Sequence, residues 1–311
     1  MEMSALDNLR IVLDPLGQAG VALALMLVMF GVALDLRVDD FRILADKPRV
    51  FFGGVVAQIL LLPLVTFGLI HLIAPPPSIA LGMIVIACCP GGSVSNLLTY
   101  FSRGEVAVSV ALTATSSMMA AFLTPASTIF WAQSYAPTAE LLESLEVSPL
   151  LFIGQTTLLL AIPLTAGMIV AARAPAFASK IRKKTTLVGA LVLVSTIIYG
   201  AIYFYPLLWP AVGLLASITI LHNGAAFLTG AAAGWLLSKQ SSVRRALTFE
   251  VGIQNSGLAL IILLSQLKGV GGAAAIAAVW GVWHIIAGGT LAFFFGYVDD
   301  KQSKRKKVVE V

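Results

Sequence analysis

Glu250 is the only acidic residue deep inside any of the long apolar segments of this 311-residue sequence. A carboxylate at such depth in a membrane is costly, and it is tolerated where it faces a water-filled cavity, pairs with a cation or serves an ion path. The seven residues that follow it include Gln254, Asn255, Ser256 and two glycines, which weaken a helix and supply oxygen atoms. We therefore expect an ion site around Glu250.

A second apolar segment, 79–101, is interrupted by Pro90, Gly91 and Gly92. Proline removes a backbone donor, and paired glycines cannot hold a helix together. Ser93 is suited to be the N-cap of the half-helix that follows. Two interrupted spans in the two halves of a membrane protein are typical of transporters built from inverted repeats, in which unwound backbone binds cations and half-helix N-termini attract anions.

Further oxygen-bearing side chains lie close to these breaks in the sequence. Ser95 and Asn96 follow the first break, and Gln58 is the one amide in the apolar segment before it. Ser109 and Thr113 are four residues apart, so they share one face of a helix, although a single hydroxyl in such a helix often only bonds the carbonyl four residues earlier. These oxygens are of the types that Na⁺ prefers.

The composition decides which elements must position these residues. Hydrophobic residues make up 59% of the sequence and charged residues 11%, whereas a soluble domain carries about 25% charged residues. Lipid must therefore surround most of the chain. With about 20 apolar residues for each crossing, we predict an all-α polytopic membrane protein with nine transmembrane helices, at 17–35, 49–74, 79–101, 104–131, 148–172, 185–206, 208–237, 243–266 and 271–297.

The basic residues are divided unequally between the connectors. If successive connectors alternate sides, one side holds 18 of the 20 Lys and Arg residues and the other holds only Arg10 and Lys268. The positive-inside rule makes the basic side cytoplasmic, so we expect an external N-terminus and a cytoplasmic C-terminus in a bacterial inner (plasma) membrane. The basic segment 298–311 is then a topology signal, and no nucleic-acid partner is expected. The 18 residues are Arg37, Arg42, Lys47, Arg49, Arg103, Arg173, Lys180, Arg182, Lys183, Lys184, Lys239, Arg244, Arg245, Lys301, Lys304, Arg305, Lys306 and Lys307.

Four strings in the sequence closely resemble the bile acid:sodium symporter family, and the resemblance runs from about residue 17 to 297. It implies an inverted repeat with two crossing discontinuous helices, about 79–101 and 243–266, and separate panel and core domains. On this pattern the panel comprises 17–35 and 148–206, and the core comprises 49–131 and 208–297. The strings are Gly91-Gly-Ser-Val-Ser-Asn96, Glu250-Val-Gly-Ile-Gln-Asn-Ser-Gly257, Ile220-Leu-His-Asn-Gly224 and Val282-Trp-His284.

The resemblance also implies two sodium sites that share Glu250. Carried over by position, the first would be formed by Ser95, Asn96, Ser109, Thr113 and Glu250. The second would be formed by Gln58, Glu250, Gln254 and the backbone carbonyls of Val251 and Ile253. Each side-chain position holds an oxygen donor in this sequence. We therefore expect two coupling Na⁺ ions and no other cofactor, since the sequence has no P-loop and no GxGxxG string.

The substrate site is expected at the half-helix N-termini, near Ser93 and Asn255, where backbone donors and the helix dipole favour an anion. His284 is a further candidate, weighed against a packed, hydrogen-bonded core histidine, whereas a structural role is favoured for His222. Two features depart from the common pattern. The Trp-His-Asn string of the family ends here in Ile285. Bacterial members often have ten helices, whereas the nine predicted here lack the first and leave four spans in the first repeat and five in the second, as in the nine-helix members.

The sequence therefore predicts a sodium-coupled symporter that imports a small organic anion by alternating access. A bile acid, pantoate, a keto acid or another carboxylate would fit, and no obligate protein partner is implied. The alternative is a cation/proton antiporter or a proton-coupled transporter in which Glu250 carries the proton, although such sites favour clusters of acids. A hydrolase using a serine and His284 is disfavoured, because the sequence lacks GxSxG, HExxH and a pair of intramembrane aspartates.

Overall fold

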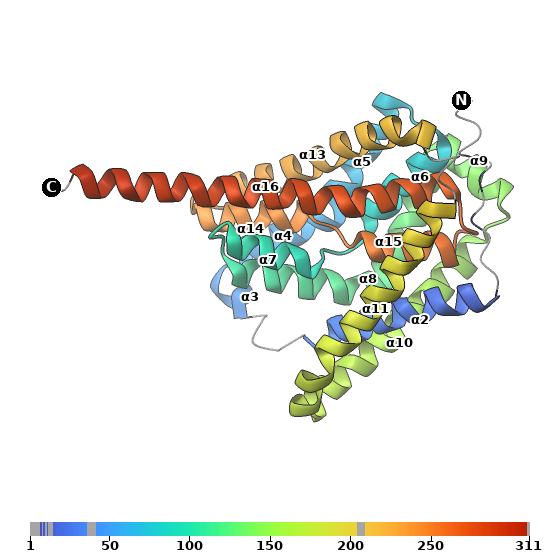
Figure 1. Ribbon diagram of the computed structural model, residues 1–311, viewed down its shortest axis with the longest axis horizontal. Helices are drawn as coiled ribbons and strands as arrows, with labels where there is room; N and C mark the ends of the chain where they lie inside the picture. Colours follow the sequence, from blue (N-terminus) through green and yellow to red (C-terminus); the bar gives the residue numbers. More distant parts are fainter. Residues whose placement is uncertain are drawn as a thin grey trace.

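The computed structural model describes residues 7, 9, 11, 15–35, 42–203 and 209–309, and these residues are almost entirely helical (Figure 1). Among the described residues, β-type pairing is limited to a single isolated bridge. In chain order the elements are α2 (Pro15–Ala33), α3 (Ile43–Asp46), α4 (Pro48–Val56), the π-helical η2 (Ala57–Leu61), α5 (Leu62–Ile73), α6 (Pro77–Cys88), α7 (Ser93–Phe101), α8 (Val106–Ser134), α9 (Ala136–Ser144), α10 (Pro149–Arg173), α11 (Pro175–Tyr203), the 3₁₀ turn η3 (Trp209–Ala211), α13 (Val212–Leu237), α14 (Ser241–Gly252), α15 (Ser256–Ser265) and α16 (Gly271–Val309).

Five helical stretches in the described part of the chain are long and apolar enough to cross a membrane. They are Pro48–Ile73, Val106–Ser134, Pro149–Arg173, Trp209–Leu237 and Gly271–Asp299. Three shorter apolar helices accompany them, and two of these, α6 and α15, are halves of the interrupted segments. The structure therefore agrees with an all-helical, multi-pass membrane protein.

Some sequence predictions fall on residues that the structure does not describe. The predicted spans 185–206 and 208–237 meet at residues 204–208, which lie outside the described residues. The same holds for Arg10 and Arg37, which entered the comparison of basic connectors, and for the last two residues of the predicted tail.

Both predicted interruptions are present, and the two breaks lie against each other. The first separates α6 from α7, and the second separates α14 from α15. Gly91 and Gln254 form the isolated antiparallel bridge, and the amide N–H of Asn255 donates to the carbonyl of Pro90 at 2.8 Å. Each break thus supplies backbone partners to the other, and these bonds replace part of the helical hydrogen bonding that is lost where the helices unwind.

Several elements differ from the sequence prediction. The acidic connector 132–147 contains the helix α9, which buries Leu141 and Leu142 in one turn. A helix of nine residues is too short to be recognised by a search for membrane-length apolar runs. The predicted tail is also helical, because α16 continues without a break from the membrane segment to Val309.

The turn that holds Gln58 is π-helical, which the sequence analysis did not predict. The π-helix η2 spans Ala57–Leu61, and Pro63 is the second residue of α5, which follows it. Proline has no N–H and clashes with the carbonyl four residues before it, and a widened turn relieves that clash. The buried Gln58 therefore projects from a locally irregular part of its helix.

Small residues bring α14 close to α13. A Cβ atom on Gly230 would meet the backbone of Leu247, and one on Gly234 would lie 2.8 Å from the Cα of Arg244. Small residues spaced by four allow helices in membranes to approach at backbone distance. The position of α14, which carries Glu250, is thereby fixed against α13.

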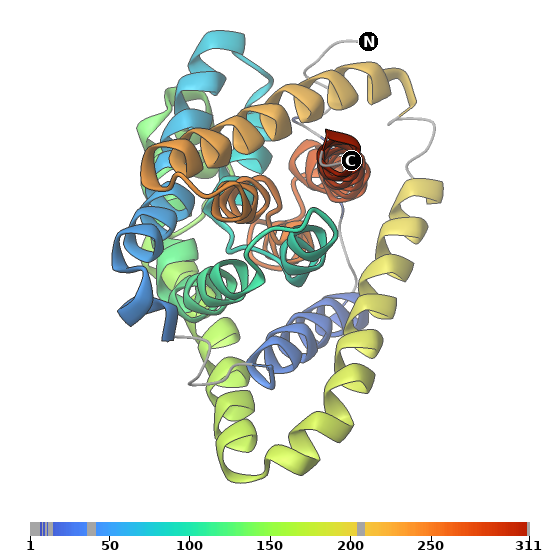
Figure 2. The ribbon, with the colours of Figure 1, turned by 90° about the vertical axis from the view of Figure 1, so that its left-hand side faces the viewer.

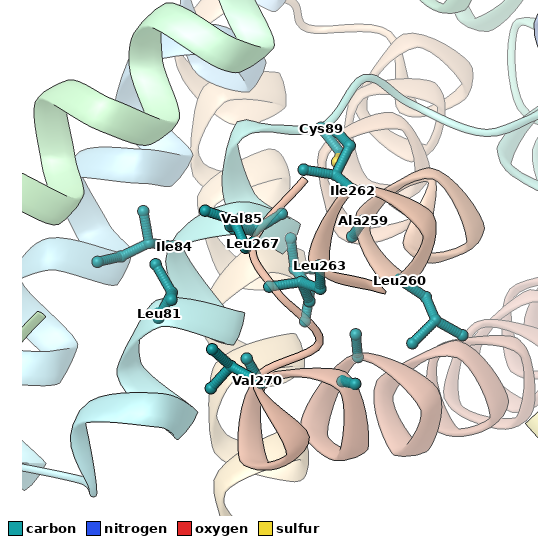
Figure 3. Close-up of a cluster of buried hydrophobic side chains, with 14 of the residues drawn as sticks. Leu81, Ile84, Val85, Cys89, Ala259, Leu260, Ile262, Leu263, Leu267 and Val270 are labelled. Carbon is teal, nitrogen blue, oxygen red and sulfur yellow. The ribbon is translucent and has the colours of Figure 1, made fainter. Parts of the chain in front are cut away.

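A cluster of buried apolar side chains holds two of the half-helices, α6 and α15, together. Leu81 and Val85 of α6 pack with Ile262 and Leu263 of α15, and Val270 lies beside them just before α16 (Figure 3). Elsewhere, α2 packs against both α10 and α11, and these three helices lie together at one side of the molecule (Figure 2). The cluster thus fixes the half-helices on one side of the breaks, while the other halves lead to the site.

Candidate functional site

The carboxylate of Glu250 is fully buried in the last turn of α14. Its Oε2 accepts hydrogen bonds from Ser95 Oγ at 2.7 Å and from Ser109 Oγ at 2.8 Å, and its Oε1 accepts from Thr113 Oγ1 at 2.7 Å. Ser109 and Thr113 lie on successive turns of α8, and Ser95 lies in the first turn of α7. Side chains of α7 and α8 thus converge on a carboxylate of α14, which lies far from them in the sequence.

The hydroxyl groups around Glu250 also approach other acceptors. Ser95 Oγ lies 2.8 Å from the carbonyl of Gly92, and Thr113 Oγ1 lies 3.2 Å from Oδ1 of Asn96. Each hydroxyl has one proton to donate, so the protons of the three hydroxyls are fewer than the four acceptor oxygens around them. A negatively charged cluster with excess acceptor oxygen is suited to hold a small cation.

Two buried glutamines approach the C-terminal end of α14. Gln58 Nε2 donates to the backbone carbonyl of Glu250 at 3.3 Å, and Gln254 Nε2 donates to the carbonyl of Val251 at 2.9 Å. The Oε1 atoms of both glutamines are buried and have no hydrogen-bond partner among the described residues. Ile253, which follows α14 as its C-cap residue, is buried beside them. Because an unsatisfied buried acceptor is costly, a cation at these oxygens would remove that cost.

Gly91 allows the first break to reach this cluster. A Cβ atom at this position would meet Glu250 Oε1 and would lie 2.7 Å from Gln58 Nε2. Its amide N–H donates to Ser116 Oγ at 3.3 Å. The glycine is therefore required by the close approach of the backbone to the carboxylate, and not only by the break in the helix.

A cavity of about 890 Å³ is lined by Ser93, Asn255 and His284, the three predicted substrate contacts. Asn255 is the N-cap of α15, and its Oδ1 accepts from the amide N–H of Leu258 at 3.0 Å. The predicted capping role of Ser93 is wrong. The N-cap of α7 is Gly92, which is extended, and Ser93 is already the first helical residue with no side-chain cap bond.

The two intramembrane histidines occupy different surroundings. His284 lines the cavity, but its Nδ1 also lies 2.8 Å from the carbonyl of Trp280, and its ring stacks on that indole with centroids 4.8 Å apart. His284 therefore lines the cavity and is also a packed, hydrogen-bonded histidine. His222 is buried, and its Nε2 lies 2.9 Å from Thr66 Oγ1, in agreement with a structural role.

Sequence reasoning missed Asn223, Asp35 and Arg182. Asn223 Nδ2 donates to the carbonyl of Gly252 at 2.8 Å, so this side chain of α13 supports the second break. The sequence feature that could have revealed Asn223 is an amide side chain inside the apolar segment 208–237, within the string Ile220-Leu-His-Asn-Gly224. Asp35 and Arg182 line the cavity, although both lie at or just beyond the ends of predicted apolar segments, where solvated charges are expected.

These features define a class of protein. The chain has several helices that can cross a membrane, two interrupted helices that meet at their breaks, and a buried carboxylate in an oxygen-rich cluster at that meeting point. Helices broken at depth in a membrane protein are characteristic of transporters, where unwound backbone lines ion and substrate sites. The protein is therefore a membrane transporter.

The chain belongs to the sodium bile acid symporter family, whose model matches residues 22–205. It is 33% identical to an uncharacterized sodium-dependent transporter of Bacillus subtilis (strain 168), over 92% of this chain and 85% of that protein. It is 30% identical to a probable sodium/metabolite cotransporter of Arabidopsis thaliana chloroplasts, over 86% of this chain and 64% of that protein. It is also 27% identical to the human ileal sodium/bile acid cotransporter, over 83% of this chain and 72% of that protein.

The family and these relatives are sodium-dependent transporters and not enzymes. The resemblance drawn from the sequence strings is thus confirmed, and the hydrolase alternative is dropped.

Proposed function

We propose that the protein is a sodium-coupled symporter that imports a small organic anion by alternating access. The observation that carries this proposal is the convergence of three hydroxyl groups on the buried carboxylate of Glu250 at the meeting point of the two breaks. An anion driven inward by Na⁺ needs an ion site next to a substrate site. Oxygen ligands for a cation and helix N-termini for an anion both adjoin these breaks.

One Na⁺ is proposed to bind Ser95, Asn96, Ser109, Thr113 and Glu250. The excess of acceptor oxygen supports this assignment, because the hydroxyl protons can turn away and present their oxygen lone pairs to a cation. The second is proposed to bind Gln58, Glu250, Gln254 and the backbone carbonyls of Val251 and Ile253. The partnerless Oε1 atoms of the two glutamines support that site.

A proton-coupled mechanism at Glu250 remains the alternative. The described residues contain no group of three or more His, Cys, Asp and Glu side chains that could share a cation. Glu250 instead has neutral hydroxyl and amide neighbours. A single carboxylate among neutral oxygens favours Na⁺ over H⁺ as the coupling ion.

The anion is proposed to bind in the 890 Å³ cavity, at the N-termini of α7 and α15 next to Ser93, Asn255 and His284. Helix N-termini offer unpaired N–H groups and a positive dipole end, and sites for drug-sized ligands measure about 300–1,000 Å³. A bile acid, pantoate, a keto acid or another carboxylate would meet these requirements. The relatives named for bile acids and for metabolites are compatible with this range.

Alternating access is proposed to result from the movement of two domains. The panel would consist of α2, α10 and α11, and the core of the remaining six of nine spans, arranged as an inverted repeat of four and five. The packing of α2 on α10 and α11 supports this division (Figure 2). The cavity is lined by α2 and Arg182 of α11 on one side of this division and by α7, α8, α15 and α16 on the other.

The N-terminus is expected to be external and the C-terminus cytoplasmic. The backbone of Ile11 and Leu9 is hydrogen-bonded to that of Gly269 and Gly271, respectively, where α16 begins. The helix α16 then spans 39 residues, from Gly271 to Val309. A helix of that length spans roughly 57 Å at 1.5 Å per residue, more than a bilayer of about 40–45 Å. A reporter fused before residue 1 should therefore behave as external and one after Val311 as cytoplasmic. Reporters on the same side would contradict the nine-span topology.

The proposed function is tested by uptake into proteoliposomes. We expect radiolabelled carboxylates to accumulate unaltered when an inward Na⁺ gradient is imposed, and not when K⁺ replaces Na⁺. An inward proton gradient without Na⁺ is the decisive control, since the proton-coupled alternative requires uptake under that condition. A prior thermal-shift screen of carboxylates with and without Na⁺ would select the substrate, because a ligand of the folded state raises the melting temperature.

A further inference from the structure

The cavity contains one ion pair that the proposed sodium and anion sites do not use. Apart from His284, Asp35 and Arg182 carry the only ionisable side chains among the described residues that line the cavity. The Nη1 of Arg182 is paired with the Oδ1 of Asp35. Their side chains are 34% and 54% exposed, respectively, so a molecule in the cavity can reach both.

The pair lies at the end of an apolar wall. Asp35 lies in the turn that directly follows α2, and Val28, Gly31 and Val32 line the cavity from the last turns of α2 itself. Residues spaced three and four apart occupy one face of a helix. A ligand held by the half-helix N-termini can therefore lie along this wall with its far end near Arg182.

The contact between α2 and α11 does not depend on the ion pair. Gly189 of α11 packs so closely on α2 that a Cβ atom there would lie 2.8 Å from Cγ2 of Val28 and 3.4 Å from the carbonyl of Ala24. This backbone-distance approach fixes the two helices by packing. The ion pair is then an addition to an existing interface, and an exposed pair of this kind adds little to stability.

An arginine in this position is suited to bind an acidic group of a ligand. Its planar guanidinium matches the two oxygens of a carboxylate, and such bidentate bonds are among the stronger hydrogen bonds in proteins. Asp35 would be the competing partner, but it contacts the guanidinium through Nη1 alone, so a ligand carboxylate that binds in the bidentate mode gains a second hydrogen bond in the exchange.

We propose that the substrate is an organic dianion and that Arg182 selects it. One acidic group binds at the half-helix N-termini near Ser93 and Asn255, which rests on the function proposed above. The second acidic group displaces Asp35 and binds the guanidinium of Arg182. Arg182 is thus a specificity-determining residue, and Asp35 tunes the affinity for the second acidic group.

The test uses the purified full-length protein in saturating Na⁺, with linear dicarboxylates from succinate to sebacate and the monomethyl ester of each as probes. At the length that spans the cavity, we expect the diacid to bind about tenfold more tightly than its monoester, the effect of one charge-assisted bidentate contact. Arg182→Gln is expected to remove this preference, so that the diacid no longer binds more tightly than its monoester. Asp35→Asn is expected to strengthen diacid binding, because it frees the guanidinium.

Lys183→Gln is the matched control, because it removes the same charge from the same helix at a residue that does not line the cavity. Arg182→Lys keeps the charge without the bidentate geometry and should retain part of the preference. Equal binding of diacid and monoester at every length, or equal effects of Arg182→Gln and Lys183→Gln on their ratio, would overturn the inference and leave the proposed function standing. The absence of sodium-dependent binding by either class of probe would overturn both.

Discussion

Replacing Glu250 by glutamine is expected to abolish stabilisation by Na⁺ and Na⁺-driven uptake. The substitution keeps the shape of the side chain but removes the charge shared by the two proposed sodium sites. It also replaces one acceptor oxygen by an amide donor, so the hydroxyls of Ser95, Ser109 and Thr113 can no longer all donate to this side chain. The melting temperature measured over a range of Na⁺ concentrations should rise for the unmodified protein, by mass action, and stay constant for the variant.

Two controls make this result specific. Glu105→Gln removes a carboxylate at the start of α8, where Glu105 pairs with Lys47 at 3.4 Å outside the cluster, and it should keep the full response to Na⁺. In sodium-free solution, Glu250→Gln should melt no lower than the unmodified protein, because it removes a buried charge that has no cation beside it. A normal response to Na⁺ in Glu250→Gln would remove this residue from the mechanism.

Much of this cluster could be predicted from the sequence because its members are polar residues in apolar segments. Such residues are costly in a membrane unless they bind something, so Glu250, Gln58 and the residues after each break stood out. The helical spacing of Ser109 and Thr113 also placed them on one face. Their convergence on Glu250 is a tertiary feature, and only the family resemblance indicated it before the structure.

Other features could not be predicted, for identifiable physical reasons. The widened turn at Gln58 depends on how Pro63 is accommodated, and a search for apolar periodicity does not detect that. The role of Asn223 depends on the backbone-distance packing of α13 on α14, which brings its amide to the carbonyl of Gly252. Asp35 and Arg182 lie at or just beyond the ends of the predicted apolar segments, where exposed charges are expected, and only their positions in space place them in the cavity.

The ion and anion sites are expected to strengthen each other. Asn96, Thr113 and Gln254 belong to the proposed sodium sites and also line the cavity, so the two sites share a wall. A sodium ion that orders the unwound stretches would also fix the half-helix N-termini that face the anion. Linkage then requires Na⁺ to raise substrate affinity by the same factor by which substrate raises sodium affinity, and such couplings are typically about 5–150-fold.

Ser109→Ala is the variant that isolates the ion side of this coupling. Ser109 donates to Glu250 at 2.8 Å, is fully buried and does not line the cavity. Deleting its hydroxyl should lower the sodium affinity about tenfold, the value of one charge-assisted bond. The apparent substrate affinity should then fall at limiting Na⁺ and return to the original value when Na⁺ is raised. Thr113→Ala should show the same recovery less completely, because Thr113 also lines the cavity.

Asn255→Ser isolates the substrate side. Serine can still cap α15, as Asn255 Oδ1 does by accepting from the amide N–H of Leu258, so the half-helix should persist, while the side-chain amide of a residue that lines the cavity is lost. Substrate binding should therefore be weaker at every Na⁺ concentration, including saturation, and Ser93→Ala should act in the same direction. The measurement is a substrate titration at a series of Na⁺ concentrations for each variant. If added Na⁺ rescues Asn255→Ser as fully as Ser109→Ala, the two residues act on the same equilibrium, and the division between ion ligands and substrate ligands is wrong.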